Sequence, residues 1–172
     1  MNTKPDFSET NPISKMLKEY DAQRAKKPRK PPYKKPESIK QLENQIYEQK
    51  KLKHEAALKP SLRDDSANGL TKCVVNWLIV NNHYGARVNV SGIYDKRLGR
   101  YRHSGATKGQ ADINAVINGR SIQIEVKHGK DKPRPEQLKT QIQVNAAGGF
   151  YLFVRSFDDF LTQINNQLIN NH

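Results

Sequence analysis

The segment from Gly109 to Lys127 limits the fold more than any other part of the chain. Within it, Asn118-Gly119 separates two stretches of alternating apolar residues. Both positions of a tight hairpin turn need φ > 0, so this dipeptide predicts a two-residue turn between antiparallel strands. The register of that turn brings mostly apolar residues together on one face, which should be buried: Ile117 with Arg120, Ala115 with Ile122, and Ile113 with Ile124.

The other face of the hairpin brings two acidic side chains together. Asp112 is expected opposite Glu125, with the two carboxylates roughly 5 Å apart. Like charges in this arrangement cost up to about 1 kcal/mol, so a cation between them or a shared proton is needed to explain it. Lys127 follows Glu125 by two residues and projects from the same face. The pattern therefore predicts a site with two carboxylates and one ammonium group.

The charge of the chain indicates a polyanionic partner. Its 172 residues include 30 Lys and Arg against 17 Asp and Glu, a net charge of +13. Such an excess is typical of proteins that bind nucleic acid, although charge can also serve solubility alone. Cys73 is the single cysteine, which excludes an intramolecular disulfide and favours a reducing compartment. The longest apolar run, Cys73–Val80, is too short to cross a bilayer, so we expect no membrane partner.

Changes in composition along the chain predict three regions. Residues 1–36 are polar and contain a basic, proline-rich block from Arg24 to Pro36, which predicts a disordered basic arm. This arm would neutralise phosphates or would be a solvated linker. Residues 37–60 are expected to form a helical linker, which either docks on the domain or forms a short coiled coil. Residues 61–172 suffice for one domain with a modest core.

The pattern within residues 61–172 predicts the order α-β-β-β-α-β-α. We expect strands over residues 85–94, 111–117, 121–127 and 150–155, and helices over 68–83, 136–147 and after Ser156. A basic loop is expected over 96–105. The strand at 150–155 is almost wholly apolar, which predicts a central position in the sheet. The helix before this strand requires a crossover, so the sheet should be mixed.

This order, with Asp112 and Glu125-Val126-Lys127 on adjacent strands, resembles the PD-(D/E)XK nuclease superfamily. Further features make residues 66–160 similar to the VRR-NUC (virus-type replication-repair nuclease) family in its phage and bacterial single-domain form: the Gly109–Asp112 spacing, Pro135-x-Gln137 opening the next helix, and Gly148-Gly149 before a strand that ends in Arg155. The resemblance implies an α/β fold with a restriction-endonuclease-like α-β-β-β-α-β core, a mixed sheet and an extra C-terminal helix.

The resemblance also implies an activity. It predicts a Mg²⁺-dependent endonuclease that hydrolyses DNA phosphodiester bonds, with Mn²⁺ as a substitute, in the cytoplasm of a bacterial or phage-infected cell. The enzyme would be structure-specific or would serve the replication and repair of a phage or mobile element. The alternative is a catalytically inactive nucleic-acid-binding module on the same fold. A homodimer is expected only by analogy.

Site residues follow from the same resemblance. The metal would be held by Asp112, Glu125 and the backbone carbonyl of Val126, and the catalytic residues would be Asp112, Glu125, Lys127 and Gln137. Lys127 would orient a water, stabilise charge or accept a proton, and Gln137 would have a positioning role. The first helix of the domain lacks the acidic residue that many relatives carry there. DNA contacts are expected from residues near the site and in the basic loop: Arg97, Arg100, Tyr101, Arg102, Lys108, His128 and Lys130.

Overall fold

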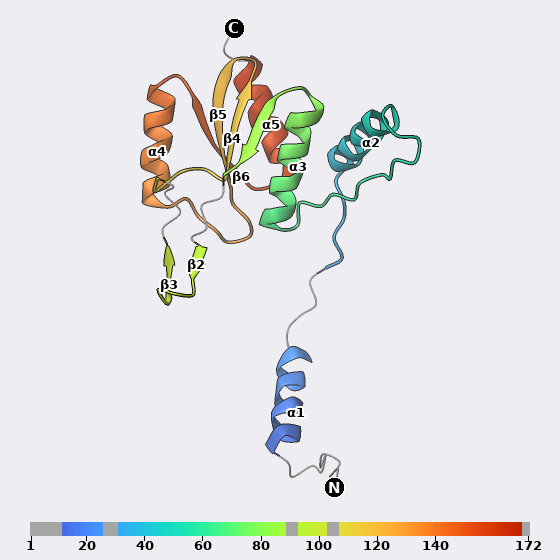
Figure 1. Ribbon diagram of the computed structural model, residues 1–172, viewed down its shortest axis with the longest axis vertical. Helices are drawn as coiled ribbons and strands as arrows, with labels where there is room; N and C mark the ends of the chain where they lie inside the picture. The colour runs from blue at the N-terminus through green and yellow to red at the C-terminus, as the bar shows by residue number, and fades with distance from the viewer. Residues whose placement is uncertain (1–11, 26–30, 89–92, 103–106, 170–172) are drawn as a thin grey trace. The chain divides into compact units, whose positions relative to one another are not determined.

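The computed structural model of the chain describes residues 12–25, 31–88, 93–102 and 107–169. It divides into two compact units, Met1–Lys34 and Lys35–His172. The first unit contains helix α1 (Pro12–Ala25) (Figure 1). The second contains, in chain order, α2 (Glu37–Lys51), α3 (Ala67–Val80), β1 (Tyr84–Arg87), β2 (Ile93–Asp95), β3 (Arg100–Arg102), β4 (Ile113–Ile117), β5 (Arg120–Val126), α4 (Pro135–Ala146), β6 (Phe150–Val154) and α5 (Phe157–Ile169).

Helix α1 corrects the prediction of a wholly disordered arm over residues 1–36. The prediction gave weight to the prolines and cations of the basic block and overlooked apolar residues at helical spacing before it. These side chains are all exposed: Ile13, Met16, Leu17 and Tyr20. Residues 1–11 and 26–30 lie outside the described residues, so the expectation of disorder there stays a prediction.

A four-stranded mixed sheet carries the second unit. Its order is β1-β4-β5-β6, in which β5 and β6 are parallel and the other pairs are antiparallel. The α4 crossover between β5 and β6 therefore produces the mixed sheet that was predicted. Strand β6 lies at one end of this order, so the predicted central position is wrong. Its apolar sequence is explained by α4 and α5, which both contact it.

The β4–β5 hairpin has the predicted register. Ile113 pairs with Ile124, and Ile117 pairs with Arg120 beside the turn. The backbone φ angles are 49° at Asn118 and 77° at Gly119, as this tight turn requires. The predicted apolar face is buried. Its side chains belong to the main core together with residues of α2, α3, β6 and α5.

Residues 85–105 contain a second hairpin, which differs from the predicted strand over 85–94 and loop over 96–105. The expected strand over 85–94 ends at Arg87 in β1, and residues 89–92 lie outside the described part. Strand β2 pairs antiparallel with β3, which lies in the segment expected to be a loop. These two strands form a sheet of their own. Two residues typical of turns mark this hairpin in the sequence: Asp95, which ends β2, and Gly99, which precedes β3.

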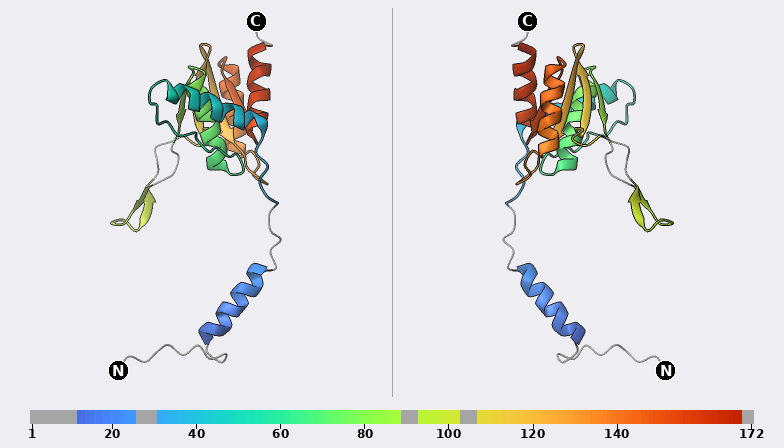
Figure 2. Two further views of the ribbon diagram at one scale, coloured as in Figure 1. Left: turned by 90° about the vertical axis from the view of Figure 1, so that its right-hand side faces the viewer. Right: turned by 90° about the vertical axis from the view of Figure 1, so that its left-hand side faces the viewer.

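Helices cover both faces of the main sheet. Helix α4 lies on one face, and α3 and α5 lie on the other (Figure 1, Figure 2). The core lies between the sheet and α3 and α5, where Leu70, Phe160 and Ile164 are buried. A buried carboxylate links the segment before α3 to the start of α5, because Asp64 Oδ2 accepts a hydrogen bond from the Phe157 amide at 3.0 Å.

Helix α2 is part of this unit, so the folded part begins at Lys35 and residues 37–60 are more than a linker. Of the two alternatives for this helix, docking on the domain is confirmed, with Ile39, Leu42 and Ile46 in the core. Glu43 anchors it, because its Oε1 accepts hydrogen bonds from Lys35 Nζ at 2.5 Å and from the Leu62 amide at 2.6 Å. Burial opposes ionisation of Glu43, but these partners outweigh it and lower its pKa.

Over the described ranges, the helices are all too short or too polar to cross a bilayer.

Candidate active site

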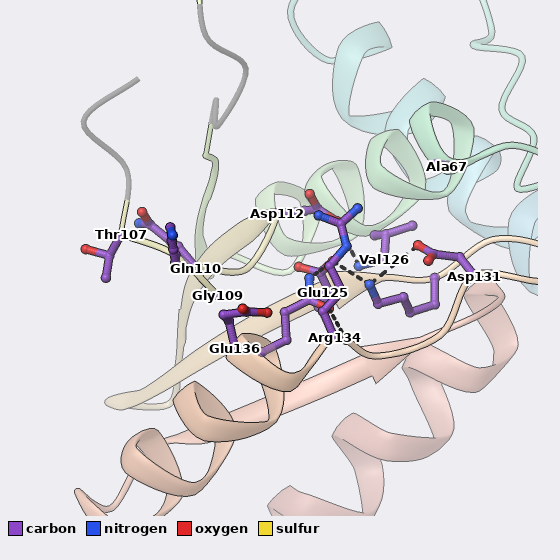
Figure 3. Close-up of a pocket in the computed structure, with 13 residues that line it drawn as sticks. Ala67, Thr107, Gly109, Gln110, Asp112, Glu125, Val126, Asp131, Arg134 and Glu136 are labelled. Carbon is purple, nitrogen blue, oxygen red and sulfur yellow. Dashed lines mark hydrogen bonds and ion pairs between the residues drawn. The ribbon is translucent and has the colours of Figure 1, made fainter. Parts of the chain in front are cut away.

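A cleft of about 640 Å³ opens where the β4–β5 hairpin meets the first turn of α4 (Figure 3). It brings together every residue predicted to be catalytic or metal-binding: Asp112, Glu125, Val126, Lys127 and Gln137. Its remaining lining comes from the start of α3, the segment before β4, the loop after β5 and the start of α4: Ala67, Thr107, Lys108, Gly109, Gln110, Asp131, Arg134 and Glu136.

Asp112 stands one residue before β4, and two hydrogen bonds hold it. Its Oδ2 accepts from the backbone amide of Val126 at 3.0 Å, and its carbonyl oxygen accepts from the Val88 amide at 2.8 Å. The register that pairs Ile113 with Ile124 brings Asp112 next to Glu125 when extended by one residue. The two acidic residues therefore lie together on adjoining strands, as the turn predicted.

Glu125 is the buried centre of the site. Its Oε1 accepts a hydrogen bond from Gln137 Nε2 at 2.6 Å and lies 3.1 Å from Lys127 Nζ. Burial raises the pKa of Glu125, and the negative charge of Asp112 raises it further. Lys127 and Gln137 act in the opposite direction without cancelling the shift. An additional positive charge between the two carboxylates would remove the conflict.

Lys127 is only 1 % exposed, which is rare for a lysine and requires paired charges. Besides Glu125, its Nζ reaches Asp131 Oδ2 at 3.4 Å. Its backbone amide donates to the Val154 carbonyl of β6 at 2.8 Å, which fixes the residue just beyond the end of β5. Sequence reasoning missed Asp131, although an acid four residues after a site lysine was a visible signal.

Gln137 has both ends of its amide bonded. It is the third residue of α4, after Pro135 at the first position, and its Oε1 accepts from the Arg134 backbone amide at 2.9 Å. This bond satisfies a free donor before the helix and orients Nε2 toward Glu125. The side chain therefore links the helix start to the acidic centre, which matches the positioning role expected for it.

Gly109 shapes the wall between the cleft and α4. Its φ is +85°, and a Cβ atom there would lie 2.5 Å from the Glu136 carbonyl oxygen and 2.5 Å from Thr140 Oγ1. The phenol of Tyr151 donates to the Gly109 carbonyl at 3.0 Å. Burial raises the pKa of Tyr151, with smaller effects from the two site carboxylates, so this donor keeps its proton. The glycine of the Gly109–Asp112 motif thus permits close packing of this segment against α4.

The residues predicted to contact DNA separate into two groups. Lys108 lines the cleft, and His128 and Lys130 are exposed in the loop that follows β5. The second group belongs to the β2–β3 hairpin or its turn: Arg97, Arg100, Tyr101 and Arg102. Arg134 also lines the cleft and was missed. Arg155 holds the loop after β5, since its guanidinium donates to the carbonyls of Gly129 and Asp131.

The two acidic residues just before α3 make bonds to other residues. Asp64 binds the Phe157 amide, and Asp65 pairs with Arg63. Asn68, in the first turn of α3, accepts a hydrogen bond from Arg87 at 2.8 Å. Among the described residues, the acidic side chains that line the cleft therefore come from the β4–β5 hairpin, the loop after it and the first turn of α4, where Glu136 lies.

The donor set suits a hard divalent cation that keeps part of its water shell. In the part of the chain that the structure describes, no three His, Cys, Asp or Glu side chains form a metal-binding group. Asp112, Glu125 and the Val126 carbonyl offer two carboxylates and one further oxygen. Mg²⁺ usually binds in this way, with one or two carboxylates, several waters and substrate phosphates. The raised pKa of Glu125 fits the same interpretation.

The sequence matches no family model and no curated protein. The functional proposal therefore rests on the geometry of the cleft and on the motifs that line it.

Proposed function

We propose that this protein is a Mg²⁺-dependent nuclease that hydrolyses internal DNA phosphodiester bonds and accepts Mn²⁺ in place of Mg²⁺. One observation supports it above all others. The motif residues Asp112, Glu125 and Lys127 line a single cleft, and Gln137 from another element is bonded to Glu125. Membership of the VRR-NUC family and a restriction-endonuclease-like core are part of this proposal.

Asp112, Glu125 and the backbone carbonyl of Val126 would hold the metal. A bound Mg²⁺ at such a site neutralises charge on the phosphoryl group and lowers the pKa of a coordinated water. The protein contributes a rigid arrangement of ligands. The Val126 amide orients the Asp112 carboxylate, and Gln137 orients the Glu125 carboxylate.

Lys127 supplies a fixed positive charge at the floor of the cleft. Glu125 and Asp131 hold its ammonium group, so little side-chain freedom is lost when a phosphate arrives. A charge that is positioned in advance stabilises negative charge as it develops on the phosphate oxygens. Lys108 and Arg134 add cations to the lining, where they would bind the flanking phosphates of the strand.

The remaining parts of the proposal concern partner and location. A net charge of +13 suits DNA as the partner, and a cytoplasmic location in a bacterial or phage-infected cell would supply this substrate. A homodimer stays a prediction, to be checked by the mass of the protein in light scattering.

Cleavage of supercoiled plasmid tests the proposal. The protein should nick plasmid with Mg²⁺ or Mn²⁺ and stop when EDTA is added. Asp112→Ala and Lys127→Ala should each lower the rate by about 10²–10³-fold, as the loss of one charge-stabilising group does. Lys139→Ala, which removes an exposed lysine of α4, is the matched control and should cut normally. If every protein binds the plasmid and none cuts it with either metal, the inactive binding module is the better description.

A further inference from the structure

The ammonium group of Lys127 is shared by two carboxylates at nearly equal distances. Its Nζ lies 3.1 Å from Glu125 Oε1 and 3.4 Å from Asp131 Oδ2. The two partners differ in their surroundings, because Glu125 is buried and the side chain of Asp131 is 48 % exposed. A buried pair is held strongly, since either charge alone would be left without water, whereas an exposed partner can gain or lose its counterion at little cost.

Glu125 has two tasks in the proposed site, and they conflict. Its Oε1 accepts the hydrogen bond of Gln137 at 2.6 Å and also faces the Lys127 ammonium group. The same carboxylate is a proposed ligand of Mg²⁺. A fixed positive charge at 3.1 Å from that ligand opposes the arrival of another cation. Lys127 and a divalent cation therefore compete for Glu125.

The backbone at Asp131 is held from both sides. Its amide donates to the His128 carbonyl at 3.2 Å, and its own carbonyl accepts from Arg155 Nη2 at 3.1 Å. Arg155 is anchored in turn at the start of α5, where its amide donates to Asp159 Oδ2 at 2.8 Å. These bonds fix the loop after β5, so the Asp131 carboxylate stays within reach of Lys127.

We infer that Asp131 is a positioning residue that takes over the Lys127 ammonium group when Glu125 becomes a metal ligand. This inference rests on the proposed function and adds how the site is loaded. Before loading, Lys127 neutralises Glu125 and spares the buried site an unpaired charge. On loading, the ammonium group moves from Glu125 to Asp131. Its charge then remains in the cleft for a phosphate but no longer opposes the metal.

Metal binding without DNA tests this exchange. Mn²⁺ is titrated into the full chain and its variants, and the unbound ion is measured by electron paramagnetic resonance. Asp131→Asn should weaken Mn²⁺ binding about tenfold, because Lys127 then stays with Glu125, and one charge within about 4–6 Å shifts such an equilibrium by tenfold or more.

Glu136→Gln is the matched control for Asp131→Asn. Glu136 is an exposed acid of the same cleft, but it is not one of the two acids that the structure pairs with Lys127. In the view of Figure 3, Glu136 and Asp131 lie on opposite sides of Glu125. Glu136→Gln should weaken Mn²⁺ binding only about twofold, through longer-range attraction in solvent. Both acids are exposed, so both variants should fold.

Removal of the lysine should act in the opposite direction. Lys127→Met should tighten Mn²⁺ binding about tenfold, because the competing charge is gone. In that background, Asp131→Asn should weaken binding only about twofold, as Glu136→Gln does. Circular dichroism checks the fold, and Lys127→Gln replaces Lys127→Met if the latter does not fold. Equal losses for the two single acid variants overturn the exchange, and so does a tenfold loss for Asp131→Asn that persists without the lysine.

The two proposals fail in different ways. The expected Mn²⁺ pattern in a protein that cuts no DNA contradicts the nuclease and supports the exchange. Equal effects of Asp131→Asn and Glu136→Gln on Mn²⁺ binding, in a protein that does cut DNA, contradict the exchange and leave the nuclease in place. Absence of Mn²⁺ binding by the parent protein overturns both.

Discussion

Replacement of Gly109 by alanine tests how tightly the wall of the cleft is packed against α4. Gly109 has a φ of +85°, and alanine in a left-handed conformation costs roughly 1–2 kcal/mol. A methyl group there would also lie 2.5 Å from the Glu136 carbonyl oxygen and 2.5 Å from Thr140 Oγ1. The first contact is with helix backbone, which cannot rotate away. The first turn of α4 must therefore move.

The size of this second effect follows from overpacking, which typically costs about 1–3 kcal/mol. The total loss for Gly109→Ala should thus be about 2–5 kcal/mol in the free energy of unfolding. The displaced turn carries Gln137, whose Nε2 is bonded to Glu125 at 2.6 Å. Movement of α4 would weaken that bond, so cleavage should also decrease in the fraction of protein that is folded.

Gly148→Ala is the matched control for this experiment. Gly148 has nearly the same φ, +81°, just after the other end of α4, but a Cβ atom there meets nothing within 4 Å. It should lose only the roughly 1–2 kcal/mol of the backbone conformation and keep its cleavage rate. Urea unfolding measures both losses, and plasmid nicking at low temperature measures the rates. Equal losses of stability in the two variants would refute the argument from close packing.

Three further predictions concern other parts of the chain. Glu43→Gln should lower the free energy of unfolding by about 1–2 kcal/mol at pH 7. Because folding lowers the pKa of Glu43 from its ordinary value of 4.5, urea titrations should show this loss disappearing as the pH falls through the folded-state pKa. Gln137→Ala should slow nicking more than tenfold with DNA affinity unchanged, since its partner Glu125 binds no phosphate itself; an equal loss of affinity would contradict this role. Deletion of residues 1–34 should make the slope of log K for DNA binding against log salt concentration shallower by up to about 5, at about 0.9 for each phosphate that the segment neutralises. An unchanged slope would exclude contacts between this segment and DNA. That estimate counts six cations: Arg24, Lys26, Lys27, Arg29, Lys30 and Lys34.

The local part of the structure could be predicted from the sequence. Asn118-Gly119 and the alternation around it determine the β4–β5 register, because both signals act over a few residues. That register was enough to bring Asp112 and Glu125 to one face. The start of α4 was equally predictable, since Pro135 favours the first helical position.

Features that depend on contacts between distant segments could not be predicted. Strand β6 is apolar because two helices cover it, and its edge position is set by the crossover rather than by its own residues. The burial of Lys127 depends on Glu125, on Asp131 and on the neighbouring strand β6. Helix α2 looks weakly apolar in isolation, yet Glu43 and the apolar side chains beside it meet partners supplied by the rest of the unit.

The bond between the Lys127 amide and the Val154 carbonyl has a consequence for protein synthesis. Strand β6 pairs in parallel with β5, and such pairing forms only after the intervening helix has been made. The ribosome must release the chain as far as Val154 before the lysine is locked in position. A growing chain therefore carries no finished cleft. Under the proposed function, a truncated product that stops before residue 150 should leave the DNA around it intact.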